Sequence, residues 1–231
     1  MNTVKYRYEM HQHTWPCSHC AGASPAGLVR HMKEEGYAGC VLTDHFYHGN
    51  SGIDRDLDWD AFCRAYEENY LQAKEAGDAL DFDVLFGIEE HVGDDKEVLL
   101  YGITPAFLYR APQLREGGLA MIYELAKAEN ALVIQAHPFR HRDYIANPMG
   151  RLDAALLDGY ELLNASNRPE DNATAFEIYG GSGKIIVAGS DCHSEVFSRK
   201  RAGIETERRI KTEKELADVL RSGQYELFGT D

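Results

Sequence analysis

Short groups of histidine and carboxylate residues recur along this sequence of 231 residues, and they are the residues best suited to chemistry. The first group is His11-Gln12-His13, and comparable groups are Glu89-Glu90-His91 and Asp191-Cys192-His193. Residues i and i+2 of an extended chain project to the same side, so both outer side chains of a group can reach one ion. Imidazole nitrogen together with carboxylate oxygen suits Zn, Mn or Fe. The groups therefore predict a metal site that several segments build together.

Each group directly follows a segment that the residue pattern predicts to be a strand. Short runs rich in Val, Ile and Leu alternate with longer helical stretches. We expect strands at 4–10, 39–42, 84–88, 98–103, 131–135, 159–163 and 184–187, and helices at 24–36, 59–76, 113–130, 169–179 and 212–222. This alternation is typical of an α/β protein with a mainly parallel sheet, either open or closed into a barrel. Polar residues after parallel strands gather at one rim, where such folds build their active sites.

Charge and composition limit the partners of the protein. The formal net charge is −14, with 38 acidic and 24 basic residues, so we expect no nonspecific binding to nucleic acid or to an anionic membrane. No apolar run is long enough to span a membrane, and the first residues lack the apolar core of a signal peptide. Five cysteines without disulfide-scaffold spacing indicate reduced thiols. We expect a cytoplasmic protein in which residues 1–231 form one domain, whereas its oligomeric state does not follow from the sequence.

Five motifs in order resemble those of the PHP family, which is named for its polymerase and histidinol phosphatase members. They are H-Q-H-T at 11–14, T-D-H at 43–45, G-I-E at 87–89, A-H-P at 136–138 and S-D-C-H at 190–193. The stretch from His11 to His19 is similar to the histidinol-phosphatase subgroup. The resemblance implies a distorted, TIM-like (β/α)7 barrel with two or three divalent metal ions, Zn, Mn or Fe, at the carboxyl ends of its strands. It also implies hydrolysis of a phosphate ester by a metal-activated hydroxide.

The resemblance further implies which residues bind the ions. The implied metal ligands are His11, His13, His19, His45, Glu89, His137, Asp191 and His193. Among them, His11, His13, Glu89 and Asp191 would hold the first ion, and Glu89 would bridge it to a second ion that His137 also ligates. A third ion would lie between His19, His45 and His193.

One ligand of the family pattern is missing from this sequence. A further His normally lies in the strand after the bridging Glu, but Leu99 occupies that place here. The second ion site would then be weak, hold a water instead, or recruit His91, which alternation places on the same side as Glu89.

Cationic side chains near the motifs are candidates for binding phosphate, because arginine pairs with phosphate oxygens in a fixed fork geometry. These are Arg140, Arg168 and Arg199. Asp44 would orient the attacking water, support a ligand from behind, or act only as a structural residue. We interpret Cys17 and Cys20 as passive neighbours of His19, because no second C-x-x-C pairs with them.

The favoured function is hydrolysis of a small phosphorylated substrate, a phosphomonoester such as histidinol phosphate. A nucleotide phosphodiesterase and a phosphotyrosine phosphatase are the alternatives among phosphoesterases. Hydrolysis of a C–N bond on a similar barrel is disfavoured, because Glu89 fills the bridging place that a carboxylated lysine would take. A degenerate barrel that binds metal for a regulatory purpose is the alternative that is not an enzyme.

Overall fold

A computed structural model describes residues 5–194 and 201–229 of the chain. Within these ranges the strands are β1 (Tyr6–Glu9), β2 (Gly39–Leu42), β3 (Asp83–Gly93), β4 (Lys96–Tyr101), β5 (Leu132–Gln135), β6 (Gly159–Asn164), β7 (Ile185–Gly189), β8 (Ala202–Thr206) and β9 (Glu226–Gly229). The helices are α1 (Pro25–Glu34), α2 (Trp59–Ala79), α3 (Pro105–Arg110), α4 (Leu119–Ala128), α5 (Pro169–Tyr179) and α6 (Glu213–Ser222), with short 3-10 turns η1 (Pro112–Glu116) and η2 (Ala154–Leu156).

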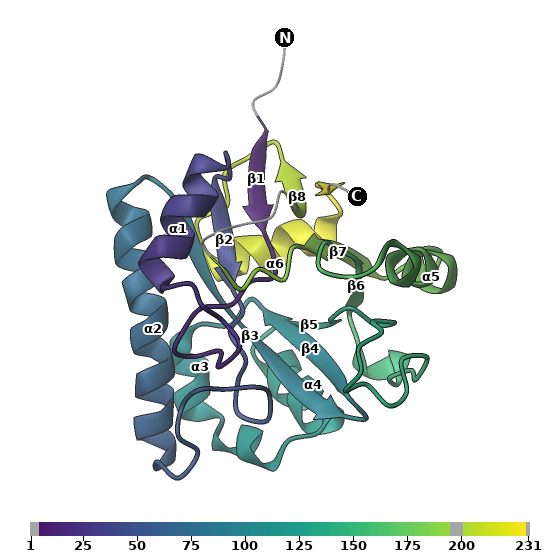
Figure 1. Cartoon of the computed structure of the whole chain (residues 1–231), viewed down its shortest axis with the longest axis horizontal. Helices are drawn as coiled ribbons and strands as arrows, with labels where there is room; N and C mark the ends of the chain where they lie inside the picture. The colour runs from purple at the N-terminus through teal and green to yellow at the C-terminus, as the bar shows by residue number, and fades with distance from the viewer. Residues whose placement is uncertain (1–4, 195–200, 230–231) are drawn as a thin grey trace.

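The strands form one sheet in the order β7-β6-β5-β4-β3-β2-β1-β8-β9. Strands β1 to β3 are parallel to one another, and so are β5 to β7. Strand β4 lies between these two groups and is antiparallel to both of its neighbours. The sheet curls until Gln12, after β1, bridges Cys192, after β7. Asp191 N–H also donates to the His11 carbonyl at 2.8 Å, which nearly closes the barrel (Figure 1). The expected α/β class with a TIM-like barrel is confirmed, although β8 and β9 add an antiparallel edge that the sequence did not predict.

The helices cover the outside of the sheet, and one of them closes the end opposite to the strand-end motifs. The long α2 runs beside α1 at the left of Figure 1. Its buried face, which includes Phe62, Tyr66 and Tyr70, packs on the sheet. By contrast, α6 packs Leu216 and Leu220 against residues that face the barrel interior, such as Leu85. The end of the barrel opposite to the strand-end motifs is therefore filled by apolar side chains.

Two helices differ from the sequence-based expectation. The helix expected over 113–130 begins only at Leu119, because Gly117 and Gly118 have φ of 71° and 88°, a backbone region that interrupts a helix. The residues before them form the 3-10 turn η1. The short helix α3 was not predicted. No helix in the described ranges is long and apolar enough to cross a membrane.

Candidate metal centre

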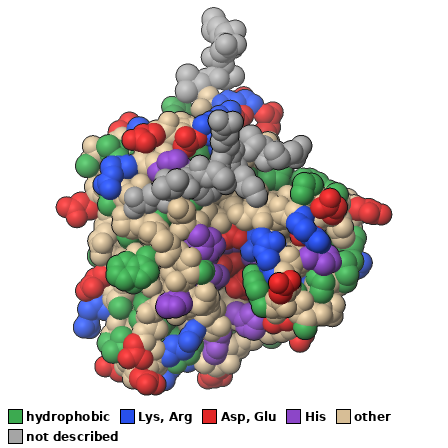
Figure 2. Space-filling model, in the orientation of Figure 1, with side chains coloured by type: hydrophobic (Ala, Val, Ile, Leu, Met, Phe, Trp, Pro, Cys, Tyr) green, Lys and Arg blue, Asp and Glu red, His purple; other side chains and the backbone are tan. Residues whose placement is uncertain are grey.

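Five strand ends bring their polar side chains together at one rim of the barrel. The residues that meet there are His11, His13, His45, Glu89, His137, Asp191 and His193. Figure 2 shows purple histidine and red carboxylate groups in a hollow of this face, with blue cationic side chains at its edge. Asp191 and His137 have positive φ values of 54° and 25°. Backbone strain of this kind is characteristic of functional sites.

Glu89 is the centre of the cluster. Its side chain is 1% exposed, and its two oxygens each lie between two imidazoles. Oε1 is 3.1 Å from His11 Nε2 and 3.0 Å from His137 Nε2. Oε2 is 3.3 Å from His13 Nε2 and 2.9 Å from His45 Nδ1. One carboxylate is thus shared between two pairs of nitrogen donors, as in a carboxylate that bridges two ions.

The H-x-H pair meets Asp191 on one side of Glu89. His11 Nε2 and His13 Nε2 are 3.1 Å apart, and Asp191 Oδ1 lies 3.7 Å and 3.2 Å from them. Two nitrogens and two carboxylates at these distances form a compact donor set for one transition-metal ion. The four residues expected to hold the first ion therefore lie together.

Buried partners fix which nitrogen of each ring faces the cluster. Glu161 Oε1 lies 3.0 Å from His11 Nδ1, and the Ser18 hydroxyl lies 3.0 Å from His13 Nδ1. His193 Nδ1 lies 2.9 Å from the carbonyl oxygen of Asp191. Carboxylate and carbonyl oxygens only accept hydrogen bonds, so they hold the proton on Nδ1 and leave the Nε2 lone pair for a metal. The sequence reading did not identify Glu161 or Ser18.

Glu97 occupies the place at which the sequence lacks a histidine. Its Oε2 lies 3.5 Å from His137 Nε2, and its Oε1 lies 3.6 Å from His45 Nδ1. Because β4 runs antiparallel, its amino end lies at the rim, and Glu97 reaches the cluster while Leu99 faces the apolar interior. His91 pairs with Glu97 across the strands but joins none of the potential ligand groups among the described residues. Of the alternatives left open for the second ion site, recruitment of His91 gains no support from the described residues. Glu97 is a neighbour of this site that the sequence did not indicate.

The arrangement suits bound cations better than internal hydrogen bonds. His45 Nδ1 is buried and lies 2.9 Å from Glu89, yet it has no hydrogen-bond partner in the described part of the chain. The His45 nitrogen and the Glu89 oxygen lie this close without hydrogen-bond geometry, as two ligands of one metal ion do. Burial alone raises the pKa of Glu89, but the charges of the His11 and His45 rings hold it well below its usual range. Burial lowers the pKa of His11, whereas the Glu161, Glu89 and Asp191 carboxylates raise it well above its usual value.

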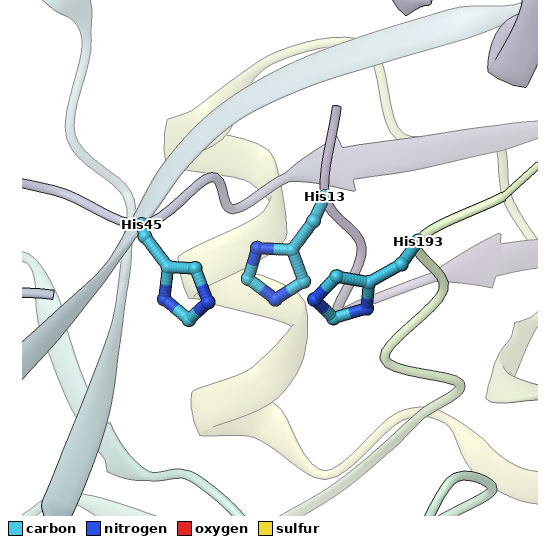
Figure 3. Close-up of side chains that lie close together, drawn as sticks. All are labelled: His13, His45 and His193. Atoms are coloured by element: carbon cyan, nitrogen blue, oxygen red, sulfur yellow. The ribbon is translucent and has the colours of Figure 1, made fainter. Parts of the chain in front are cut away.

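The third predicted site has a different composition from the one expected. Three rings, those of His13, His45 and His193, lie close enough to share an ion (Figure 3). His19 is exposed and is absent from the ligand groups of the described residues, so the structure does not bring it into the cluster. Its neighbour Cys20 instead lines the cavity beside His45 and His193. Burial raises the pKa of the Cys20 thiol, but hydrogen bonds with His193 and His45 bring it down to about 6.

The predicted arginines have three different outcomes. Arg140 is buried, and its Nε and Nη2 groups donate to Asn167, Asn164 and Asp191, so that Nη1 keeps its N–H donors for a ligand in the cavity. Arg168 is half exposed and pairs with Asp171 at 2.6 Å, away from the metal cluster. Arg199 lies outside the described residues.

Asp44 supports the centre from behind and does not face it. Its carboxylate accepts hydrogen bonds from the hydroxyl groups of Thr14 and Ser18, both at 2.7 Å, and from Asn69 Nδ2 at 2.8 Å. Ser18 in turn accepts from the His45 backbone N–H at 2.9 Å. Burial raises the pKa of Asp44 to about 6, although these hydrogen bonds lower it. Of the roles considered for Asp44, this contact pattern fits support of the ligands and not orientation of a water.

A cavity of about 390 Å³ opens above the cluster. Its walls carry Glu89, Glu97, Asp191 and Arg140 among other residues. A smaller cavity of about 170 Å³ adjoins it and shares Asn50, Glu97 and Tyr144 with it. The pair is large enough for a small molecule but offers few cationic groups, because Arg140 is the only described arginine or lysine that lines either cavity.

No family model matches this sequence, and no curated protein matches it either. Solved structures do share its fold. A two-domain protein from Bacteroides vulgatus, which contains a predicted PHP-like metal-dependent phosphoesterase, has a TM-score of 0.72 at 14% identity, over 97% of this chain and 65% of that one. A candidate metal-dependent phosphoesterase from Bifidobacterium adolescentis gives 0.58 at 14% identity, over 93% and 95% of the two chains. The lesion-specific endonuclease EndoQ from Pyrococcus furiosus gives 0.58 at 15% identity, over 97% and 58%.

These similarities define the class of fold. The chain has the barrel of PHP-like metal-dependent phosphoesterases, and it spans less than two thirds of the length of the Bacteroides vulgatus protein. The likeness in fold agrees with the motif resemblance read from the sequence.

Proposed function

We propose that this protein hydrolyses small phosphomonoesters with the help of divalent metal ions at the barrel rim. The observation that carries the proposal is the position of Glu89, whose two oxygens each face a separate pair of imidazoles at 2.9–3.3 Å. The similarity in fold to PHP-like metal-dependent phosphoesterases supports the same reaction class.

The proposed ligand sets follow from the contacts. His11, His13 and Asp191 hold a first ion with Glu89, which also serves a second ion with His137 and Glu97. Two or three ions of Zn, Mn or Fe suit this mixture of imidazole and carboxylate. When bound, such ions supply the Lewis acidity that lowers the pKa of water and offset charge on the phosphoryl oxygens.

The side chains of the protein orient the ester. Hydrogen bonds to Asn164 and Asn167 hold the Arg140 guanidinium in place and leave its Nη1 group for a ligand in the cavity. Because the side chain is already ordered, binding of phosphate costs little side-chain entropy. Its ion pair with Asp191 also holds that carboxylate against the H-x-H pair. Arg140 thus binds phosphate and positions a ligand at once.

The cavities favour one phosphate on a small, uncharged or cationic alcohol. The described walls contain one arginine and no lysine, and Asp95 lines the smaller cavity. A second phosphate in that cavity would meet the Asp95 carboxylate without a matching cation. A phosphomonoester such as histidinol phosphate meets this requirement.

The test is phosphate release from a panel of phosphomonoesters, histidinol phosphate included, by protein reconstituted with Mn or Zn. We expect release that a chelator abolishes and added metal restores. If metal-loaded protein releases phosphate from no monoester, phosphodiesters become the expected substrates. If it hydrolyses no diester either, the barrel binds metal without turnover.

Arg140 provides a matched pair of variants. Arg140→Lys loses charged hydrogen bonds worth about 1.5–3 kcal/mol, so kcat/KM should fall about 10- to 100-fold. Arg168→Lys changes an exposed ion pair with Asp171, away from the metal cluster, and should leave kcat/KM within about twofold. Equal losses in both variants would contradict the role given to Arg140.

A further inference from the structure

The smaller cavity beside the metal centre has walls that are rich in rings. His48, His91 and Tyr144 all line this space of about 170 Å³. They come from three separate segments, namely the loop after β2, the strand β3 and the loop that follows β5. Tyr144 also lines the larger cavity above the metal cluster, so its ring lies where the two cavities meet.

A short turn places Tyr144 at this junction. Ile145 N–H donates to the Arg142 carbonyl at 3.0 Å, which closes a turn with Tyr144 at one of its two central positions. The Arg142 guanidinium donates to the Ser166 carbonyl at 2.6 Å and ties the turn to the segment after β6. The Tyr144 side chain itself is 70% exposed, so it packs little against the protein and has free surface for a ligand.

The hairpin between β3 and β4 holds the rest of this loop. Lys96 Nζ donates to the carbonyl oxygens of Pro138 and Pro148, at 3.1 Å and 3.0 Å, and so joins the two ends of the loop. Ala146 N–H donates to Asp95 Oδ2 at 2.9 Å. The backbone that carries Tyr144 is therefore fixed on both sides of the ring, although the ring is exposed.

The wall formed by His48 is also fixed before a ligand binds. Its backbone N–H donates to Glu90 Oε1 at 2.7 Å. Its Nε2 lies 3.2 Å from the Arg115 carbonyl oxygen, which only accepts, so Nε2 carries a proton. The ring centre lies 5.1 Å from that of Tyr47 in an edge-to-face contact. Walls of this kind bind a ligand without a large cost in ordering.

The size and lining of the smaller cavity define what it accepts. A cavity of about 150 Å³ admits one benzene ring, so the space here suits a single ring and is too small for a nucleoside. Aromatic side chains prefer to stack on another ring or to meet its edge. The Asp95 carboxylate in the wall disfavours a negatively charged group.

We propose that the smaller cavity is the subsite for the alcohol of the ester, that this alcohol carries a single ring, and that Tyr144 determines this specificity by packing on that ring. The inference rests on the proposed function, because it assumes that the phosphate lies in the larger cavity beside Arg140. An ester with one ring should then bind better than an alkyl ester of the same chain length.

The test compares two phosphonates that differ only by a ring. Phenethylphosphonate and ethylphosphonate have a C–P bond in place of the ester bond, so their binding to the metal-loaded full chain can be measured by calorimetry without turnover. Wild-type protein should bind phenethylphosphonate more tightly by about 2- to 12-fold, the range of one aromatic contact. Tyr144→Ala should remove this difference and leave the affinity for ethylphosphonate unchanged. Tyr144→Phe keeps the ring and should keep the difference.

Met149→Ala is the matched control. Met149 lies in the same loop and is 48% exposed, but it lines neither cavity in the described part of the chain. Its truncation should leave both affinities unchanged. Equal losses of phenethylphosphonate affinity in Tyr144→Ala and Met149→Ala would overturn the assignment, and so would a loss in Tyr144→Phe as large as that in Tyr144→Ala.

The same measurements separate this inference from the proposed function. Wild-type protein that binds both phosphonates equally would refute the ring subsite but leave the phosphate site in place. Protein that binds neither phosphonate, with metal bound, would refute the position given to the phosphate and the subsite with it. A ring preference that depends on Tyr144, in protein that hydrolyses no ester, would refute only the proposed hydrolysis.

Discussion

The two ends of the barrel are built from opposite kinds of residue. At the rim, charged and polar groups such as Glu89, His11 and Asp191 are almost completely buried and lie against one another. At the other end, Leu216 and Leu220 of α6 pack on apolar strand residues. The charged residues at that end, Arg209 and Asp83, form an ion pair with each other at the periphery of the barrel.

This difference separates function from stability. Burial of charges costs free energy that their mutual attraction does not fully recover, so the rim is a poor source of stability without its ions. Burial of apolar side chains is the main favourable contribution to folding. Changes at the rim should therefore alter metal binding and activity, and changes at the α6 end should alter the free energy of unfolding.

Glu89→Gln should have the largest effect on function. The amide keeps the shape of the side chain but loses the charge that both ligand pairs share, so activity should fall by more than about 100-fold, beyond the loss seen when a supporting partner is removed. Measurement of phosphate release and of metal per chain checks this.

Glu90→Gln is the matched control for Glu89→Gln. Burial raises the pKa of Glu90 to about 8, so its carboxyl is mostly protonated at pH 7 and an amide is a close substitute. Metal content and activity should stay near wild type in this variant. Wild-type activity in Glu89→Gln would remove Glu89 from the centre of the proposal.

Leu216→Ala tests the other end of the barrel. Leu216 is fully buried under the strands, so its truncation should lower the free energy of unfolding by about 2–5 kcal/mol. Urea unfolding measures this change, and activity per folded molecule at low temperature should remain unchanged. A loss of activity without a loss of stability would show that the two ends are coupled.

The residues of the rim could be predicted because each ligand group is a short motif of neighbouring residues. Each H-x-H or D-x-H group follows an apolar run, so the order of strand and ligand can be read without knowledge of the fold. The seven expected strands are all present, with ends shifted by a few residues. The strands β8 and β9 escaped prediction because both are short and neither alternates between buried and exposed residues: β8 is almost entirely buried, and β9 is partly to fully exposed.

The missed site residues depend on geometry that the pattern does not encode. Whether β4 runs parallel or antiparallel decides if Leu99 or Glu97 reaches the rim, and both residues lie on the same face of the strand. The turn between Ser18 and Ala21 decides whether His19 or Cys20 faces the cluster. Glu161 supports His11 across 150 positions of sequence, a contact that only the closed sheet creates.

Ser18→Ala should have the smallest effect among these changes, and it separates the direct ligands from their supports. The Ser18 hydroxyl has one proton, which it donates to Asp44, so it must accept from His13 Nδ1 and hold that ring with Nε2 toward the cluster. Removal of such a support weakens metal binding by about 10- to 100-fold. Titration with Zn against a competing chelator measures this change, and ¹⁵N NMR of the histidine rings should show a mixture of tautomers at His13. Ser51→Ala removes a hydroxyl in the adjacent loop whose hydrogen-bond partner in the described part of the chain is the Ile53 N–H, and it should leave the affinity unchanged. Equal affinities in the wild type and Ser18→Ala would mean that the carboxylates of the rim orient His13 without help from behind.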